Sequence, residues 1–488
     1  MDGKRLQGIA RRKSDYSIVS GKPRNGGGEK GVAGVRKEKR DTAAIHRDGV
    51  QLSTKLSSLT SRARGNPKYK FTSVSNLLMN EDFLRGCYWE LKRDKSPGVD
   101  RVTIEEYGRD LEENLKGLVK RLRSWKYKPQ PVRRVYIPKA KGGKRGLGIP
   151  TVEDKIVQRG IARILEAIFE VDFQDVSYGF RPGRSCHQAL DVLDKAIMFK
   201  PINCVVDVDI KKFFDSIRHD WLMKCLRQRI TDTNLLRLIG RILNTGIMDE
   251  GKLIEVDKGT PQGGVVSPIL ANIYLHYIID LWFERVFKRE LKGYTQLIRF
   301  ADDFVVVFQH RHEAERFAES LKQRLSKFGL EIAEDKSRVI EFGRSVWQRV
   351  QRERMQIATF DFLGFTHFCD KTRRGGFKLG RKTSRAKFTQ KIKAMNQWLK
   401  KVRNQVKLTE WWSTLRLKLI GHYNYYGLSG NYEALMKFYR LVIKLAYKWI
   451  NRRSQRKSFN YARYYRFMSH NPLPKPKIYH SIYMTSSC

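Results

Sequence analysis

The sequence predicts a mixed α/β body followed by a basic helical region. Apolar residues recur three and four positions apart over 152–169, which is the period of an amphipathic helix. The segments 204–210 and 297–309 are instead apolar and β-branched, as buried strands are, and both contain carboxylates. After Asp370 the chain becomes basic and aromatic with helical spacing. These differences in residue composition and spacing divide the chain into a body and a helical region.

The boundaries follow from shifts in composition. Residues 1–64 are basic, contain a glycine run and lack apolar periodicity, so we expect a mobile N-terminal arm. The body covers 65–370, the helical domain 371–468, and a short basic tail with several prolines 469–488. Residues 131–150 alternate and then turn at a glycine pair, which predicts a hairpin. The helices are expected at 74–93, 103–124, 152–169, 381–403, 411–426 and 432–451.

The charge of the chain is strongly positive and uneven. Its 488 residues include 97 Lys and Arg against 50 Asp and Glu, a net charge of +47. This balance excludes an ordinary metabolic enzyme for small neutral substrates and implies a polyanionic partner, nucleic acid above all. Residues 371–488 hold 28 basic residues and only two acids. A segment nearly without acids cannot compensate its charge by ion pairs, so we expect it to contact phosphate backbone.

Two acidic clusters lie on the apolar segments, Asp207 with Asp209 and Asp302 with Asp303. A carboxylate in a hydrophobic strand needs a partner. One alternative is ion pairing with nearby lysines such as Lys211 and Lys212. Converging carboxylates on neighbouring strands would instead make an oxygen-rich site for Mg²⁺. In a protein that binds nucleic acid, such a site favours two-metal phosphoryl or nucleotidyl transfer, although a nuclease could use the same ions.

Several motifs around these carboxylates resemble one known family. They are KSPGVD (95–100), KRGLGIP (144–150), SYGFRPGRS (177–185), DIKKFFD (209–215), GTPQGGVVSPILANIYL (259–275), FADD (300–303) and FLGF (362–365). In this order, over roughly 69–468, they resemble the reverse transcriptase/maturase proteins encoded by bacterial group II introns. The resemblance implies an α/β right-hand polymerase fold with fingers and palm, followed by an all-helical thumb/maturase (X) domain.

The resemblance also implies a function. The chain would be an RNA-directed DNA polymerase that binds intron RNA to assist splicing and supports intron mobility (retrohoming) by target-primed cDNA synthesis. Its partners would be group II intron RNA, a template–primer duplex, target DNA and deoxynucleoside triphosphates, with two Mg²⁺ ions as cofactor. We expect no HNH endonuclease domain, because no Cys/His pairs follow Tyr479.

Residue roles are carried over from the matching motifs. Asp209, Asp302 and Asp303 are implied to form the catalytic metal-binding triad, with Asp207 a spectator and Asp215 structural. The resemblance also implies a set of nucleotide-binding residues. They flank the glycine turn of the expected hairpin or lie in the motifs DIKKFFD and GTPQGG and in the segment GLEIAEDKSRVI, and they are Lys139, Arg145, Phe214, Gln262 and Lys336.

The implied RNA- or DNA-binding residues lie in the helical domain. They are Tyr425, Arg452, Arg453, Arg456 and Lys457. Aromatic rings can stack on bases and arginines can hold phosphates, although an aromatic stripe is more often core. We therefore expect about half of the tyrosines at 423, 425 and 426 to face inward.

Two other functions remain open from the sequence. The chain could be a splicing factor that keeps a polymerase fold without polymerase activity, or an intron-derived reverse transcriptase used in host DNA repair or defence. The six scattered cysteines, the absence of a signal peptide and the absence of a membrane span indicate a cytoplasmic bacterial protein associated with the nucleoid or with ribonucleoprotein.

Overall fold

The computed structural model describes residues 54–138, 143–255, 257–260, 263–353, 358–453 and 459–482. All of them belong to one compact unit, Leu52–Cys488. The described part of the expected mobile arm, 54–64, is helical, so the expectation is wrong there; residues 1–53 lie outside the described part. Buried Arg229 holds this helix, because its guanidinium donates to the Ala63 carbonyl at 2.8 Å.

The two long helices expected at 74–93 and 103–124 are each interrupted. The first consists of the 3-10 helix η1 (Ser75–Met79) and α2 (Glu81–Trp89). Asn80 separates them because its side chain accepts a hydrogen bond from a backbone amide in the first turn of α2. The second consists of α3 (Ile104–Tyr107) and α4 (Leu111–Arg123).

The hairpin expected over 131–150 is confirmed. Strands β1 (Val132–Pro138) and β2 (Lys144–Ile149) pair antiparallel. Strand β1 also pairs in parallel with β4 (Ile247–Asp249), which in turn pairs with β5 (Lys252–Ile254). The hairpin therefore belongs to a small sheet of its own, in the order β2-β1-β4-β5.

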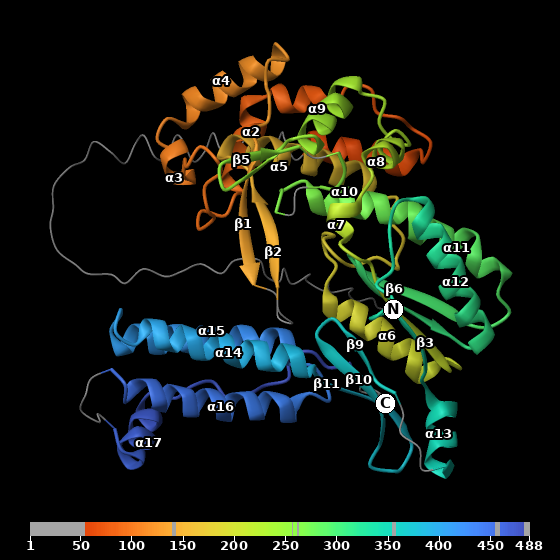
Figure 1. Cartoon of the computed structure of the whole chain (residues 1–488), viewed down its shortest axis with the longest axis vertical. Helices are drawn as coiled ribbons and strands as arrows, with labels where there is room; N and C mark the ends of the chain where they lie inside the picture. Colours follow the sequence, from red (N-terminus) through yellow and green to blue (C-terminus); the bar gives the residue numbers. More distant parts are fainter. Residues whose placement is uncertain are drawn as a thin grey trace, which may run out of the picture. The chain divides into compact units, whose positions relative to one another are not determined.

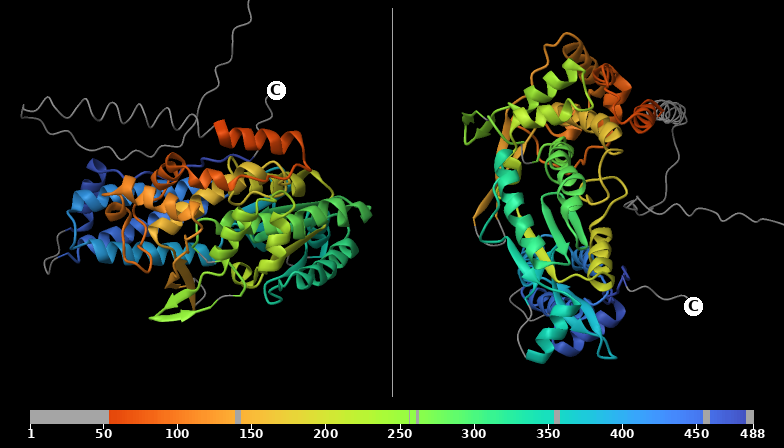
Figure 2. Two further views of the ribbon diagram at one scale, coloured as in Figure 1. Left: turned by 90° about the horizontal axis from the view of Figure 1, so that it is seen from above. Right: turned by 90° about the vertical axis from the view of Figure 1, so that its right-hand side faces the viewer.

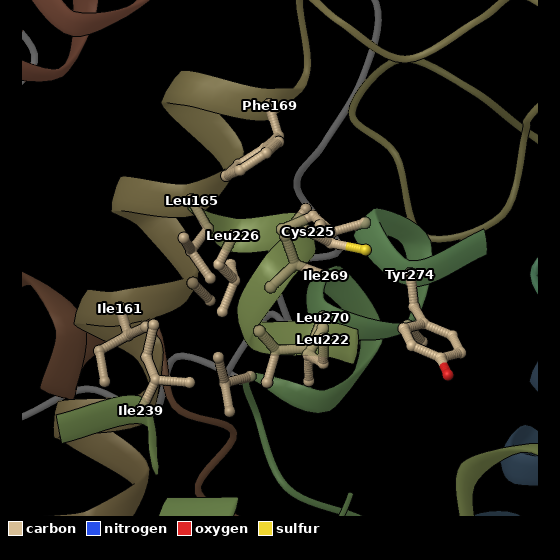
Figure 3. Close-up of a cluster of buried hydrophobic side chains, with 14 of the residues drawn as sticks. Ile161, Leu165, Phe169, Leu222, Cys225, Leu226, Ile239, Ile269, Leu270 and Tyr274 are labelled. Carbon is tan, nitrogen blue, oxygen red and sulfur yellow. The ribbon is translucent and has the colours of Figure 1, made fainter. Parts of the chain in front are cut away.

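Helix α5 spans Val152–Phe169, as predicted, and contributes to the largest hydrophobic core. Its buried face packs with α8 (His219–Leu226), α9 (Thr233–Leu243) and α10 (Ser267–Leu275) (Figure 3). Leu165 of α5 is fully buried, and truncating such a leucine to alanine costs about 2 to 5 kcal/mol. This core supports the sheet that carries the carboxylates.

That sheet, the palm sheet, is antiparallel in the order β6-β7-β3-β8. Its strands are β3 (Cys204–Asp209), β6 (Thr295–Phe300), β7 (Asp303–Phe308) and β8 (Arg338–Glu341). The prediction of a single strand over 297–309 is wrong, because Ala301 and Asp302 turn the chain between β6 and β7. Helices α12 (Arg311–Lys327) and α6 (Cys186–Phe199) cover opposite faces of the sheet, which explains its continuously apolar strands (Figure 1).

A third sheet, of three strands, connects the palm sheet to the helical region. Its order is β11-β10-β9, with β9 at Phe360–Phe362, β10 at Phe365–Lys371 and β11 at Phe377–Thr383. The expected division between 370 and 371 therefore falls inside the β10–β11 hairpin, because charge composition changes before the sheet ends.

Four helices follow, α14 (Arg385–Val402), α15 (Leu408–Tyr426), α16 (Tyr432–Ile450) and α17 (Tyr461–His470). The first three confirm the helices expected from apolar spacing. Helices α14 and α16 pack against each other (Figure 1), and Figure 2 gives two further views of the chain. Together they form a helical layer whose buried side chains belong to the same hydrophobic core as the β11-β10-β9 sheet.

The expected tail is in part a packed segment, which we call the C-terminal segment (471–482). Its Leu473 side chain is buried. The Trp412 indole donates to the Asn471 carbonyl at 3.0 Å, and the Tyr423 hydroxyl donates to the Pro474 carbonyl at 3.1 Å. The segment therefore fastens α15 at several points along its length.

The remaining elements are shorter. They are α7 (Phe213–Ser216), the π-helical turn η2 (His276–Asp280), α11 (Leu281–Arg285), the 3-10 helix η3 (Phe287–Glu290) and α13 (Arg344–Glu353). Among the described residues, no helix has the length and apolar character needed to cross a bilayer.

Candidate active site and nucleic-acid cleft

The palm sheet brings the predicted carboxylates to one place. Asp209 ends β3 and Asp303 begins β7, and the two residues are direct partners in the antiparallel ladder. Side chains of directly opposite residues lie on the same face of a sheet. Asp302 occupies the turn that precedes β7. All three carboxylates therefore lie at one end of the palm sheet.

The turn that carries Asp302 has an unusual backbone. Ala301 has a φ of +58°, a left-handed value that residues other than glycine rarely adopt. Gly179 packs against this turn so closely that a Cβ atom there would overlap the Ala301 amide nitrogen. The motif SYGFRPGRS thus requires glycine at 179 because the turn that carries Asp302 lies against it.

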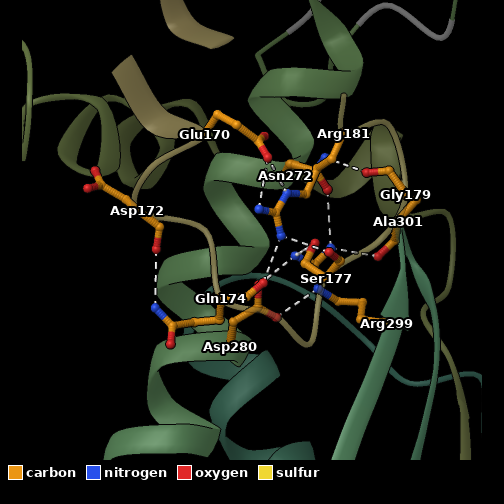
Figure 4. Close-up of polar contacts among 10 residues, drawn as sticks. All are labelled: Glu170, Asp172, Gln174, Ser177, Gly179, Arg181, Asn272, Asp280, Arg299 and Ala301. Carbon is orange, nitrogen blue, oxygen red and sulfur yellow. Dashed lines mark hydrogen bonds and ion pairs between the residues drawn. The ribbon is translucent and has the colours of Figure 1, made fainter. Parts of the chain in front are cut away.

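A buried polar network supports the same turn (Figure 4). The guanidinium of Arg299 is fully buried and pairs with the Asp280 carboxylate at 2.6 Å. It also donates to the Ala301 carbonyl at 2.9 Å. Asn272 donates to the Gly179 carbonyl at 2.7 Å. These hydrogen bonds therefore fix both the Ala301 turn and the Gly179 backbone that packs against it.

The sequence alone does not predict this network. Asn272 lies inside the motif GTPQGGVVSPILANIYL and Arg299 directly precedes FADD, so the motifs point to these two residues. No motif points to Asp280, because it reaches Arg299 from the π-helical turn η2, 19 residues away in the sequence. Its pairing depends on the tertiary fold.

The carboxylates of the site crowd one another. The pKa of Asp303 is raised to about 7, first by removal from bulk solvent and then by the charges of Asp207, Asp302 and Asp209. Its side chain nevertheless still reaches the solvent of the cleft. Burial likewise raises the pKa of Asp302, and that of Asp207 to about 6. Asp207 therefore contributes to the negative field. A cation placed among these groups would relieve their repulsion.

Lys336 supplies one positive charge at the site. Its Nζ lies 2.6 Å from a carboxylate oxygen of Asp209, and this hydrogen bond raises the pKa of Lys336. The alternative of ion pairing with a lysine therefore holds for Asp209, but through Lys336; Lys211 pairs instead with Glu331 at 3.2 Å. The structure thus brings Lys336 to the end of β3 that carries Asp209.

Arg145 brings a second positive charge from the fingers hairpin. It lies on β2, opposite Ile137, and is exposed. Its charge acts on Asp302 and opposes the rise in the pKa of that carboxyl. Lys139, the other predicted cation of this turn, lies outside the described residues.

Phe214 lies in α7, directly after the catalytic strand. Its ring is half-buried and meets the Phe213 ring edge-on at 5.3 Å. Its carbonyl accepts a hydrogen bond from the Thr260 amide at 2.7 Å. This bond places the start of the GTPQGG segment beside the aromatic residue.

The GTPQGG segment also touches the fingers hairpin. Gly263 has a φ of +111°, and a Cβ atom there would come within 2.8 Å of the Gly148 carbonyl oxygen. Packing on β2 is therefore a sufficient reason for glycine at this position. Gln262, predicted to contact the nucleotide, lies outside the described residues.

A cleft with a volume of about 780 Å³ extends from Asp303 between α14 and α15. Three exposed lysines line it, Lys387, Lys391 and Lys418. The Lys418 ammonium lies 4.8 Å from the centre of the Trp398 ring, which also lines the cleft. We call it the polymerase cleft; its cationic walls suit the phosphates of a nucleic acid.

The three tyrosines at the end of α15 differ in burial, because their positions on the helix place them on different faces. Tyr423 and Tyr426 are buried in the core, which confirms that a part of this group faces inward. Tyr425 is 37% exposed and lines the polymerase cleft. Its hydroxyl donates to the Leu363 carbonyl at 3.0 Å, in the FLGF motif.

The predicted RNA-binding arginines follow α16. Arg452 is exposed and its guanidinium lies 5.7 Å from the centre of the Trp449 ring. Arg453 is half-buried. Arg456 and Lys457 lie outside the described residues.

The donor chemistry of the site fits magnesium. Within the described residues, no group of three His, Cys, Asp or Glu side chains is arranged to hold a metal ion. Mg²⁺, however, commonly takes one or two protein carboxylates and completes its shell with water and substrate phosphates. Asp209 and Asp303 provide neighbouring carboxylates, and burial together with the charges of Asp207, Asp302 and Asp209 raises the pKa of Asp303, so a bound cation would stabilise its ionised form.

Residues 137–367 match the reverse transcriptase (RNA-dependent DNA polymerase) family. This region contains all three carboxylates and ends inside β10, before α14. The chain thus contains a reverse transcriptase domain, and its sheets and following helices have the predicted right-hand polymerase fold.

Curated relatives match parts of the chain. Group II intron-encoded protein LtrA of Lactococcus lactis subsp. cremoris is 37% identical over 222 residues, 45% of this chain and 37% of that protein. Protein YkfC of Escherichia coli strain K12 is 39% identical over 197 residues, 39% of this chain and 51% of that protein. Nuclear intron maturase 4 of Arabidopsis thaliana is 28% identical over 151 residues, 31% of this chain and 19% of that protein. The chain therefore spans about half or less of the length of these relatives.

Proposed function

We propose that this chain is an RNA-directed DNA polymerase of a bacterial group II intron that also binds intron RNA to assist splicing and supports intron mobility. The main support is the pairing of Asp209 with Asp303, beside Asp302, inside a reverse transcriptase domain. The names of the relatives, an intron-encoded protein and an intron maturase, support the splicing role. Target-primed cDNA synthesis would join the two activities.

In the proposed reaction the carboxylates of Asp209, Asp302 and Asp303 would hold two Mg²⁺ ions. Such ions activate a primer 3′-hydroxyl and stabilise the departing pyrophosphate. Asp209 and Asp303 share one face of the palm sheet, and Gly179 and the buried Arg299 hold the turn that carries Asp302. The protein thereby contributes fixed geometry rather than covalent chemistry.

The surrounding side chains would bind the nucleotide. Arg145 would hold the triphosphate, since a guanidinium can grip phosphate in bidentate fashion. The half-buried Phe214 ring would accept deoxyribose and clash with a ribose 2′-hydroxyl. Lys336, hydrogen-bonded to Asp209, would donate a proton to the leaving pyrophosphate. Lys139 and Gln262 would complete this set.

The polymerase cleft would hold the template–primer duplex. Lys387, Lys391 and Lys418 would contact its phosphates, with Tyr425 nearest the FLGF motif. Arg452 and Arg453 would contact intron RNA or target DNA beyond α16, with Arg456 and Lys457 as further cations.

Substitution of the triad tests this proposal. Asp302→Ala should lower the rate of primer extension on an RNA template by about 10³-fold or more, because it removes charge aimed at the reacting phosphate. Binding of intron RNA and splicing assistance should persist. Asp191→Ala, which removes a half-buried carboxylate on α6, is the matched control and should extend primers normally.

Two results would contradict the proposal. Near wild-type extension by the Asp302→Ala variant would show that the triad is wrongly assigned. A wild-type chain that assists splicing but extends no primer would instead favour a splicing factor without polymerase activity.

A further inference from the structure

A second basic groove runs along α9, outside the polymerase cleft. It has a volume of about 1020 Å³ and lies between α9, the end of α8 and the residues that precede β1. Four exposed cations line it, Lys70, Lys128, Arg227 and Arg237. We call it the α9 groove.

The charge of the α9 groove is not compensated. No acidic residue is among those that line it, and in the described part of the chain its four exposed cations form no ion pair. A carboxylate at the start of α9, Asp232, is buried and accepts hydrogen bonds from backbone amides, among them those of Asn234 and Leu235. So concentrated a positive charge favours a polyanion.

The groove is separate from the catalytic end of the hairpin. Its wall includes Gly246, whose carbonyl accepts a hydrogen bond from the Val132 amide at 2.9 Å, where β1 begins. Arg145 pairs with Ile137, near the tip of the hairpin. Five residues of strand separate the two ends, which is about 17 Å.

The lining of the groove suits unpaired nucleotides. Its apolar part is formed by Pro129, Met223 and Leu236, while the cations lie at exposed positions. Exposed bases and sugars can lie against this apolar surface while the phosphates meet the cations beside it. Thr233 and Asn244 add a hydroxyl and an amide that can bond a ribose 2′-hydroxyl.

We propose that the α9 groove binds a single-stranded segment of RNA while the polymerase cleft holds a duplex. The groove would then tether an unpaired part of an RNA that the chain uses, at a site that takes no part in the chemistry. The proposal does not depend on polymerase activity, because it concerns binding alone.

The first test is a charge-neutral triple variant, Lys128→Gln with Arg227→Gln and Arg237→Gln. The probe is a labelled oligouridylate RNA of about 12 nucleotides, added to the full chain with the cleft saturated by a template–primer duplex. Three lost phosphate contacts should lower the slope of log affinity against log salt by about 2. Primer extension on a short template should remain unchanged.

The matched control neutralises three exposed cations that do not line the groove. They are Arg285, Arg289 and Lys292, each replaced by Gln. This control alters net charge equally and should leave the salt slope unchanged. An equal loss in the control would overturn the proposal, because it would indicate attraction by net charge alone.

A second variant fills the groove without altering charge. Gly240 lines the groove and has open space beside it, so Gly240→Leu should fold and weaken RNA binding by about fivefold or more, because an aliphatic side chain occupies the space and offers no ring on which a base could stack. Unaltered binding would overturn the proposal. Loss of RNA binding when the duplex saturates the polymerase cleft would also overturn the proposal. Equal affinity for single-stranded RNA and single-stranded DNA of the same length would overturn it as well.

Discussion

Asp303 shows at the scale of one residue why this site requires positive charge. Burial, followed by the charges of Asp207, Asp302 and Asp209, disfavours its ionised form. Its folded pKa of about 7 lies above its ordinary value of 3.8. The folded chain therefore binds an extra proton between these values, and its stability falls as the pH rises through that window.

A neutral substitution should remove this pH dependence. Without added Mg²⁺, Asp303→Asn should melt at a higher temperature than the wild type at pH 8, and the difference should shrink as the pH falls toward about 4. Thermal melts at several pH values measure it. A variant that is less stable at pH 8 would show that Asp303 is not strained by its neighbours. The same variant should lose primer extension.

Asp280 is a buried residue whose loss should lower the free energy of unfolding. Arg299 would remain fully buried without a counter-charge in Asp280→Ala, and breaking such a pair costs about 3 to 5 kcal/mol. Urea unfolding of the two chains measures the loss. Asp220→Ala is the control, because it breaks an exposed pair with Arg218 and should cost about 1 kcal/mol or less. Equal losses would refute a structural role for the buried pair.

At the scale of elements, the C-terminal segment acts as part of the helical layer. Removing residues 471–488 would leave the Trp412 indole and the Tyr423 hydroxyl without their backbone acceptors and would expose the core around Leu473. We expect a melting temperature several degrees lower, since each unpaired buried donor costs about 1 to 3 kcal/mol.

A shorter truncation is the matched control for this prediction. Removing only 483–488 keeps every described contact of the C-terminal segment and should leave the melting temperature unchanged. If both truncations melted alike, the segment would contribute nothing to the stability of α15.

At the scale of the whole molecule, the +47 charge is distributed over distinct surfaces. The palm end concentrates carboxylates, whereas the polymerase cleft and the α9 groove concentrate cations. Charge of this kind raises affinity and association rate without specifying sequence. Its position, rather than its total, should therefore decide what each surface binds.

Salt dependence measures the cleft directly. Neutralising Lys387, Lys391 and Lys418 to Gln should lower the slope of log affinity against log salt for a template–primer duplex by about 2 to 3. The matched control replaces Lys116, Lys120 and Lys327, which are exposed and outside the cleft. If the slope fell equally in the cleft variant and in the control variant, the cleft would not be the site that binds the duplex.

The sequence by itself determined the features that depend on neighbours along the chain. Periodicity located α5, α15 and α16, alternation located the β1–β2 hairpin, and the motifs named the carboxylates of a reverse transcriptase domain. These features are local because turns, pleats and caps are set by adjacent residues.

The tertiary structure alone decided which distant groups meet. It divided 297–309 into two strands, placed Lys336 on Asp209 and buried Arg299 against Asp280. It also assembled the polymerase cleft and the α9 groove from segments far apart in the sequence. The physical reason is that burial and ion pairing depend on what packs across a core, which no local pattern records.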